Sequence, residues 1–176
     1  MSTFMIYKVS LVLVVLILAL YYDLRENKIK NFVTLPAAIA GLVLNSWHEG
    51  WMGFWAALQG WLIPTLLLFI LYYINVMGAG DIKLFAALGS IMGLPFALES
   101  FVHTIFIGGI IAMVLLLVRG QFVASMSRLI RYFKLLMWSG KLHPYCAKED
   151  ASSKFAFTTA IVPGTLVQLF FTLTRM

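Results

Sequence analysis

Six long apolar stretches divide this chain of 176 residues. A helix needs about 20 mainly apolar residues to cross a bilayer. Within lipid, every backbone polar group must find its partner inside the protein, which makes helices the default for such stretches. The sequence therefore predicts an all-α polytopic membrane protein with about six transmembrane helices. The predicted spans cover approximately residues 4–22, 32–47, 53–75, 82–98, 100–118 and 155–173.

Composition supports this class, because 62% of the residues are hydrophobic and only 11% are charged. Soluble domains carry about 25% charged residues. Six spans with short connections use nearly the whole chain, so we expect residues 1–176 to form a single transmembrane domain. The fourth and fifth stretches meet near Gly89, Gly93 and Pro95, where either a simple boundary or a re-entrant turn fits the sequence.

Lysines and arginines fall unevenly between alternate connections. Eleven of the 13 lie in the connections at about residues 23–31, 76–83 and 119–154, and only Lys8 and Arg175 lie on the other side. Because positive residues mark the cytosolic side, both termini are predicted to be extracytoplasmic. The formal charge of +6 is explained by this topology, so no nucleic-acid partner is expected. The basic stretch 119–154 fits either an amphipathic helix on anionic lipid or a solvated connector.

Two of the three aspartates, Asp23 and Asp81, fall at the predicted cytosolic ends of spans. An acid in lipid costs about 2.5–3.5 kcal/mol at a helix centre, so acids at this depth suggest a function. If two carboxyls approach each other, they share a proton, one acting as base and the other as acid on a water molecule. Such aspartyl-protease chemistry needs no cofactor or metal. The three histidines and the single Cys146 show no metal-ligand spacing.

Gly78 and Gly80 precede Asp81 in the run Met77-Gly78-Ala79-Gly80-Asp81. Without Cβ atoms, they let a substrate backbone or a neighbouring helix approach the acid, and they permit a positive φ. Two simpler interpretations stay open at this point. Asp81 is a good helix N-cap, and Asp23, followed by Arg25, fits a solvated acid paired with a base.

Two runs of the sequence resemble the motifs of the type IV prepilin peptidases. The run Asp23-Leu24-Arg25-Glu26-Asn27-Lys28-Ile29-Lys30-Asn31 resembles their first aspartate motif, and Gly78-Ala79-Gly80-Asp81-Ile82-Lys83 resembles the second, the GxGD signature. The resemblance implies a GxGD intramembrane aspartyl protease-like fold with Asp23 and Asp81 as the catalytic pair. It also implies that Gly78 and Gly80 shape the site, with Lys83 and Asn31 in supporting roles.

The same resemblance implies cleavage of the leader peptide from prepilins or prepilin-like proteins at the cytosolic face of a cell (inner) membrane. Larger members of the family carry a cysteine-containing insert after the first span that is associated with N-methylation. Here that connection is only residues 23–31, so no methyltransferase activity is expected. The expected partners are the prepilin, with its leader and hydrophobic helix, and membrane lipid. A homo-oligomer stays open, as do a non-catalytic pilus-assembly scaffold and a small ion-coupled transporter.

Overall fold

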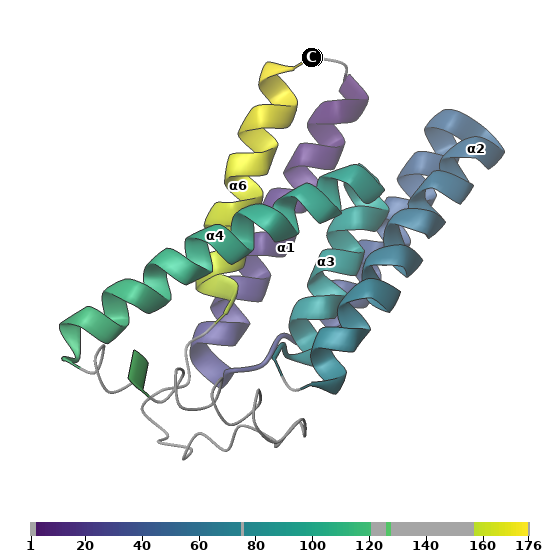
Figure 1. Cartoon of the computed structure of the whole chain (residues 1–176). Coiled ribbons are helices and arrows are strands. Elements are labelled where there is room, and N and C mark those ends of the chain that lie inside the picture. The colour runs from purple at the N-terminus through teal and green to yellow at the C-terminus, as the bar shows by residue number, and fades with distance from the viewer. Residues whose placement is uncertain (1–2, 75, 121–125, 128–156, 176) are drawn as a thin grey trace, which may run out of the picture. The chain divides into compact units, whose positions relative to one another are not determined.

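The computed structural model describes residues 3–74, 76–120, 126–127 and 157–175, and they are almost entirely helical (Figure 1). Within these residues there is no strand, which confirms the all-α prediction. The basic stretch 119–154, for which an amphipathic surface helix and a solvated connector both fit the sequence, lies almost wholly outside the described residues. The main helices are α1 (Thr3–Glu26), α2 (Asn31–Tyr73), α3 (Ala79–Met92), α4 (Leu94–Val118) and α6 (Thr158–Thr174).

The long helix α2 contains a break at Gly50, which has φ 59 and ψ −138. A glycine adopts this conformation readily because it has no Cβ. The chain turns back there, since the Gly53 α-carbon lies so close to the Asn45 carbonyl oxygen that an added Cβ would stand 2.0 Å from it. The two predicted spans 32–47 and 53–75 are therefore the two halves of α2.

The predicted boundary between the fourth and fifth stretches is wrong by several residues. The structure ends α3 at Met92 and begins α4 at Leu94, so the stretch 82–98 is not one helix. Gly93 separates the two helices with φ 100, a value that L side chains rarely adopt. Pro95 follows in the first turn of α4, where its missing N–H costs no helical hydrogen bond.

Three of the helices, α1, α2 and α4, are long and apolar enough to cross a membrane, among the residues that the structure describes. Helix α6 is apolar but shorter, and α3 has 14 residues. At 1.5 Å per residue, α3 is about 21 Å long, less than a bilayer core of about 30 Å. The structure is that of a helical membrane protein, and the count of six spans stays a prediction.

Helix α3 is buried between the two halves of α2. Gly60 and Gly89 cross so closely that a Cβ on either would stand 2.0 Å from the other's carbonyl oxygen. On the opposite side, Asn45 Nδ2 donates to the carbonyl oxygens of Ser90 at 3.0 Å and Ile91 at 3.2 Å. Small residues and interhelical hydrogen bonds are the usual means of packing helices in lipid. They fix α3, and with it the helix start that carries Asp81.

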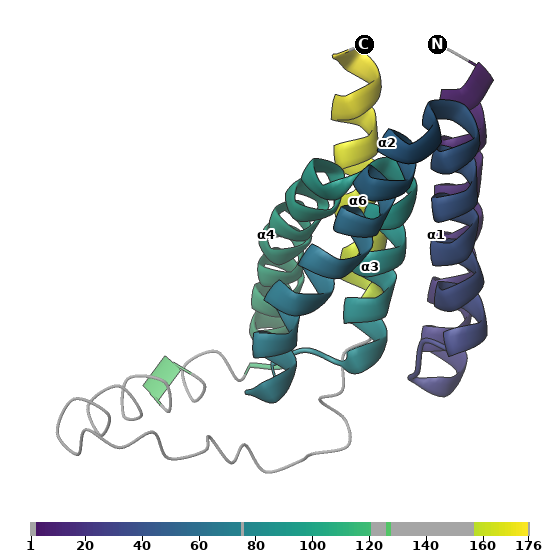
Figure 2. The ribbon, with the colours of Figure 1, turned by 90° about the vertical axis from the view of Figure 1, so that its right-hand side faces the viewer.

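Helix α6 packs against α1 and the first part of α4. Gly164 lies against Thr104, where a Cβ would meet the Thr104 backbone nitrogen at 2.7 Å. Gln168 Nε2 donates to the Glu99 carboxylate nearby. Figure 2 shows the first turn of α1 and the last turn of α6 at one end of the bundle, with the start of α3 at the opposite end. The extracytoplasmic location of both termini stays a prediction.

The chain divides into two compact units, Met1–Ile107 with Ala156–Met176, and Gly108–Phe155. The first contains α1, α2, α3, α6 and the first half of α4. The second holds the rest of α4 and residues that mostly lie outside the described part of the chain. The single-domain prediction for residues 1–176 stays a prediction.

Candidate active site

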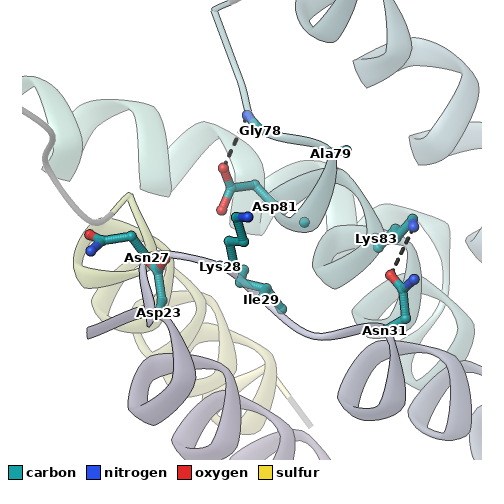
Figure 3. Close-up of a pocket in the computed structure, with 10 residues that line it drawn as sticks. Asp23, Asn27, Lys28, Ile29, Asn31, Gly78, Ala79, Asp81 and Lys83 are labelled. Atoms are coloured by element: carbon teal, nitrogen blue, oxygen red, sulfur yellow. Dashed lines mark hydrogen bonds between the residues drawn. The ribbon is translucent and has the colours of Figure 1, made fainter. Parts of the chain in front are cut away.

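All six residues that the sequence singles out line one cavity of about 340 Å³ in the first unit. The cavity lies where α1 ends, α2 begins and α3 begins (Figure 3). Segments about 50 residues apart in the chain thus form one site. Its lining residues are Asp23, Asn27, Lys28, Ile29, Asn31, Gly78, Ala79, Gly80, Asp81 and Lys83.

Asp23 lies in the last turn of α1, and its side chain is buried, with 7% of the residue exposed. Its Oδ2 accepts a hydrogen bond of 3.3 Å from the backbone N–H of Thr158. Thr158 is the first residue of α6, so this carboxylate faces the N-terminus of a helix, where the helix dipole stabilises negative charge. The simpler interpretation of Asp23 as a solvated acid paired with a base is therefore wrong.

Asn27 ends α1 one turn after Asp23. Its backbone N–H donates to the Asp23 carbonyl oxygen at 2.8 Å, and its φ is 52. Asn tolerates this left-handed conformation better than most residues and often ends helices in this way. The chain then turns into residues 28–30 and starts α2 at Asn31, so the whole connection lies at the edge of the cavity.

Asp81 lies in the first turn of α3, ahead of the apolar part of that helix, and is half-buried. Its Oδ2 accepts a hydrogen bond of 3.2 Å from the Gly78 N–H. Gly78 is the N-cap residue, so Asp81 stands at the third position of the helix rather than at the cap itself. It satisfies one unpaired N–H of the helix start, as acids at this position commonly do.

The local environment disfavours the ionised form of Asp81. Burial, which is the largest cause, and then the nearby charge of Asp23 raise the pKa of the Asp81 carboxyl from 3.8 to about 6. The Gly78 N–H opposes this rise because it stabilises the anion. Within the described structure, no hydrogen bond joins the two carboxylates directly. They face a shared space in which a water molecule, which occupies about 30 Å³ in the liquid, fits easily.

The two glycines act through the space they leave. A Cβ at Gly80 would stand 3.0 Å from the Ile29 Cβ, so this glycine lets the α1–α2 connection pack against the start of α3. A Cβ at Gly78 would stand 3.0 Å from Asp81 Oδ2. Neither glycine has a positive φ, so the permissive backbone allowed for in the sequence analysis is not used here.

Lys83 and Asn31 join the two motif segments. Lys83 Nζ donates to Asn31 Oδ1 at 2.8 Å, across 52 positions of sequence (Figure 3). The bond ties the first residue of α2 to the first turns of α3. On the other side of the connection, Lys30 forms an exposed ion pair of 2.7 Å with Glu26.

Four lining residues were not singled out from the sequence, namely Asn27, Lys28, Ile29 and Ala79. All four lie within the two motif runs, so the runs themselves were the available signal. Thr158 was also missed, because it contributes a backbone N–H that every residue except proline carries. Among the described residues, no group of three or more His, Cys, Asp or Glu side chains is placed to hold a metal ion.

The fold and this cavity define a class: a helical membrane protein with two acids from different helix ends facing one space. Comparison with known families identifies the class more closely. Residues 10–115 match the model of the type IV leader peptidase family, which is more than half of the chain. The chain therefore belongs to the type IV leader peptidase family, and the resemblance noted in the sequence is confirmed.

A similar protein is the prepilin leader peptidase/N-methyltransferase of Bacillus subtilis (strain 168). The two sequences are 31% identical over 104 residues. The aligned region covers 58% of this chain and 40% of that relative, so the chain spans well under half of the relative's length in this comparison. No solved structure matches the chain.

Proposed function

We propose that this protein is a membrane aspartyl endopeptidase that removes the leader peptide from type IV prepilins or prepilin-like proteins. The observation that carries the proposal is the joint placement of Asp23 and Asp81 on one cavity. Family membership supports the reaction class. The raised pKa of Asp81 supports a division of roles between the two acids, because it leaves this carboxyl close to half-protonated near pH 6.

In the proposed reaction, Asp23 is the base and Asp81 is the acid. A water molecule held between them loses a proton to Asp23 as its oxygen attacks the carbonyl carbon of the scissile peptide bond. Asp81 gives its proton to the carbonyl oxygen, which forms a tetrahedral gem-diol. As this intermediate collapses, Asp23 passes the proton it took from water to the leaving amine, and Asp81 takes a proton back from a gem-diol hydroxyl, so both acids return to their starting states. The C–N bond breaks, and the products are a new carboxyl terminus on the leader and a new amino terminus on the mature protein.

The reaction is proposed to take place on the cytosolic side of a cell membrane. Lys28 and Lys83 line the cavity, and Arg25 and Lys30 lie beside it, whereas Lys8 and Arg175 belong to the opposite end of the helices. Basic residues at the cavity end agree with the positive-inside rule. Methylation of the new terminus is not part of the proposal, because only residues 27–30 separate α1 from α2.

Co-expression with a candidate prepilin tests the proposal. The size of the prepilin is followed by electrophoresis with the wild-type protein, Asp23→Asn, Asp81→Asn and the matched control Asp150→Asn, which changes the third aspartate of the chain. We expect shortening with the wild-type protein and the control, and full-length prepilin with the other two variants. Processing that persists in Asp23→Asn or Asp81→Asn would refute the catalytic pair. A non-catalytic scaffold would leave the prepilin full length in all four cases.

Methyl transfer is tested separately. Purified protein is incubated with prepilin and methyl-labelled S-adenosylmethionine, and the mature product is examined for label. Cleavage without label is expected, whereas label in the product would contradict a peptidase-only activity.

A further inference from the structure

A second cavity, also of about 340 Å³, opens between the two halves of α2 and helix α3. Beyond Asn31 and Lys83 its lining is mainly apolar, with two hydroxyls, Thr34 in the first half of α2 and Thr65 in the second half. The other residues that form the walls are Leu35, Ala38, Trp61, Leu62 and Ala86. Leu35 and Leu62 are 52% and 44% exposed, so this cavity is a groove that is open to the lipid.

The groove is continuous with the candidate active site. Asn31 and Lys83 line both cavities, and the bond between them forms the shared wall. From there the groove follows α2 past Leu35 to Ala38, seven residues beyond Asn31, which is about 10 Å along a helix. It therefore leads from the two acids into the apolar part of the bundle.

We propose that this groove binds the apolar membrane segment of the substrate that directly follows the scissile bond. The inference rests on the proposed function and assigns a place in the fold to the hydrophobic helix that the expected prepilin substrate carries: the groove lined by Leu35, Leu62 and Ala86. Because Asn31 and Lys83 line both cavities, a chain held between Asp23 and Asp81 reaches the groove by passing these two side chains. Those two side chains offer an ammonium and an amide to backbone carbonyls, and the walls beyond them offer mainly apolar surface and the hydroxyls of Thr34 and Thr65.

This placement gives a function to the close packing of α2 against α3. The groove walls come from α2 and α3, the two helices whose close crossing at Gly60 and Gly89 fixes their separation. A fixed groove of this kind holds a helix in one register, and register decides which peptide bond lies between the acids. Positioning of the reacting bond is a large part of catalysis, because a misplacement of about 1 Å can lower the rate about 100-fold.

Groove-filling substitutions test the inference. Leu62→Trp places a larger side chain in the groove, and Leu67→Trp is the matched control. Leu67 is 50% exposed, does not line the groove and points about 140° away around the same helix. Each variant is assayed in detergent–lipid micelles against full-length prepilin and against a soluble peptide that spans the cleavage site but lacks the apolar segment.

For full-length prepilin, we expect kcat/KM of Leu62→Trp to fall by about tenfold or more, mainly through KM, as for misfits in apolar pockets. Leu67→Trp should match the wild type, and both variants should cleave the short peptide as the wild type does. Equal kcat/KM for the two variants on prepilin would overturn the inference and would leave phospholipid as the occupant of the groove. An equal loss on both substrates would also overturn it, because the effect would then not depend on the apolar segment.

Cross-linking gives a second readout that does not depend on turnover. In a Cys146→Ser background, which removes the native cysteine, Leu62→Cys or Leu67→Cys is combined with Asp81→Asn and with prepilin carrying one cysteine in its apolar segment. Cross-links from position 62 and none from position 67 are expected. If position 62 gives no cross-link although the wild-type protein cleaves the same prepilin, the binding of the apolar segment in this groove is refuted and the proposed function stands. If the wild-type protein does not cleave prepilin, both the proposed function and this inference fail.

Discussion

Replacing Asp81 by asparagine should stabilise the folded protein at neutral and alkaline pH. The folded-state pKa of Asp81 is about 6, against 3.8 for an unperturbed aspartate. The folded state therefore holds this proton more tightly than the unfolded state does. Ionising Asp81 therefore lowers the free energy of unfolding. This loss of stability is absent below about pH 3.8 and complete above about pH 6. Asparagine cannot ionise, and its amide oxygen can still accept the hydrogen bond from Gly78.

The size of the effect follows from the pKa difference. A rise of about two units corresponds to about 3 kcal/mol, at about 1.4 kcal/mol per unit. At about 2–4 °C per kcal/mol for a chain of this size, the Tm of Asp81→Asn at pH 8 should exceed that of the wild type by about 6–12 °C. At pH 4 most of this gain should be absent.

Thermal unfolding in detergent micelles, followed by circular dichroism at pH 4 and pH 8, measures this difference. Glu26→Gln is the control, because it removes a charge from an exposed ion pair with Lys30. Exposed pairs contribute about 1 kcal/mol or less, so its Tm should change little at either pH. A Tm of Asp81→Asn that is equal to or below the wild-type value at pH 8 would refute the reasoning. So would a gain of the same size at both pH values.

Three further predictions concern the site and the helix packing. If Asp81 is the acid, kcat/KM for prepilin should fall about tenfold per pH unit above about pH 6; a flat profile from pH 6 to pH 8 would exclude that role. Gly80→Ala should reduce kcat/KM at least about tenfold, because its Cβ would stand 3.0 Å from the Ile29 Cβ and displace the connection beside the acids; wild-type kinetics would show that the contact is unimportant. Gly89→Ala should lower stability by about 1–3 kcal/mol, as overpacked cores do, whereas Gly109→Ala, with nothing within 4 Å of its Cβ, should not; thermal unfolding of both variants compares them, and equal Tm values would contradict the close helix crossing.

The break in α2 was predictable from sequence, because polar residues around Gly50 interrupt an otherwise apolar run. The position of the break at Gly93 was not predicted correctly. Apolar residues continue on both sides of this glycine, so hydropathy gives no signal there. What separates α3 from α4 is a single backbone conformation, φ 100 at Gly93. A local dihedral angle of this kind is visible in a structure and only hinted at by a glycine two residues before a proline.

The parts of the candidate site that consist of chemically distinctive side chains were predictable from the sequence. Asp23 and Asp81 stand out because acids are scarce in this chain and both occur in motifs. The hydrogen bond from Thr158 to Asp23 was not predictable, because its donor is a backbone N–H supplied by a helix 135 positions away. The groove between α2 and α3 was hidden for a related reason: apolar residues that line a groove look the same in sequence as those that face lipid.

The most direct test of the account is the kinetics of prepilin cleavage by the double variant Asp23→Asn/Asp81→Asn beside the two single variants. Residues that act on one water molecule as a unit give losses that do not add. Each single variant should lose at least about a thousandfold in kcat, within the range of general acid–base catalysis, and the double variant should be no more than about tenfold slower than either. A single variant within tenfold of the wild type, or losses that multiply in the double variant, would contradict the claim that the two carboxyls act together.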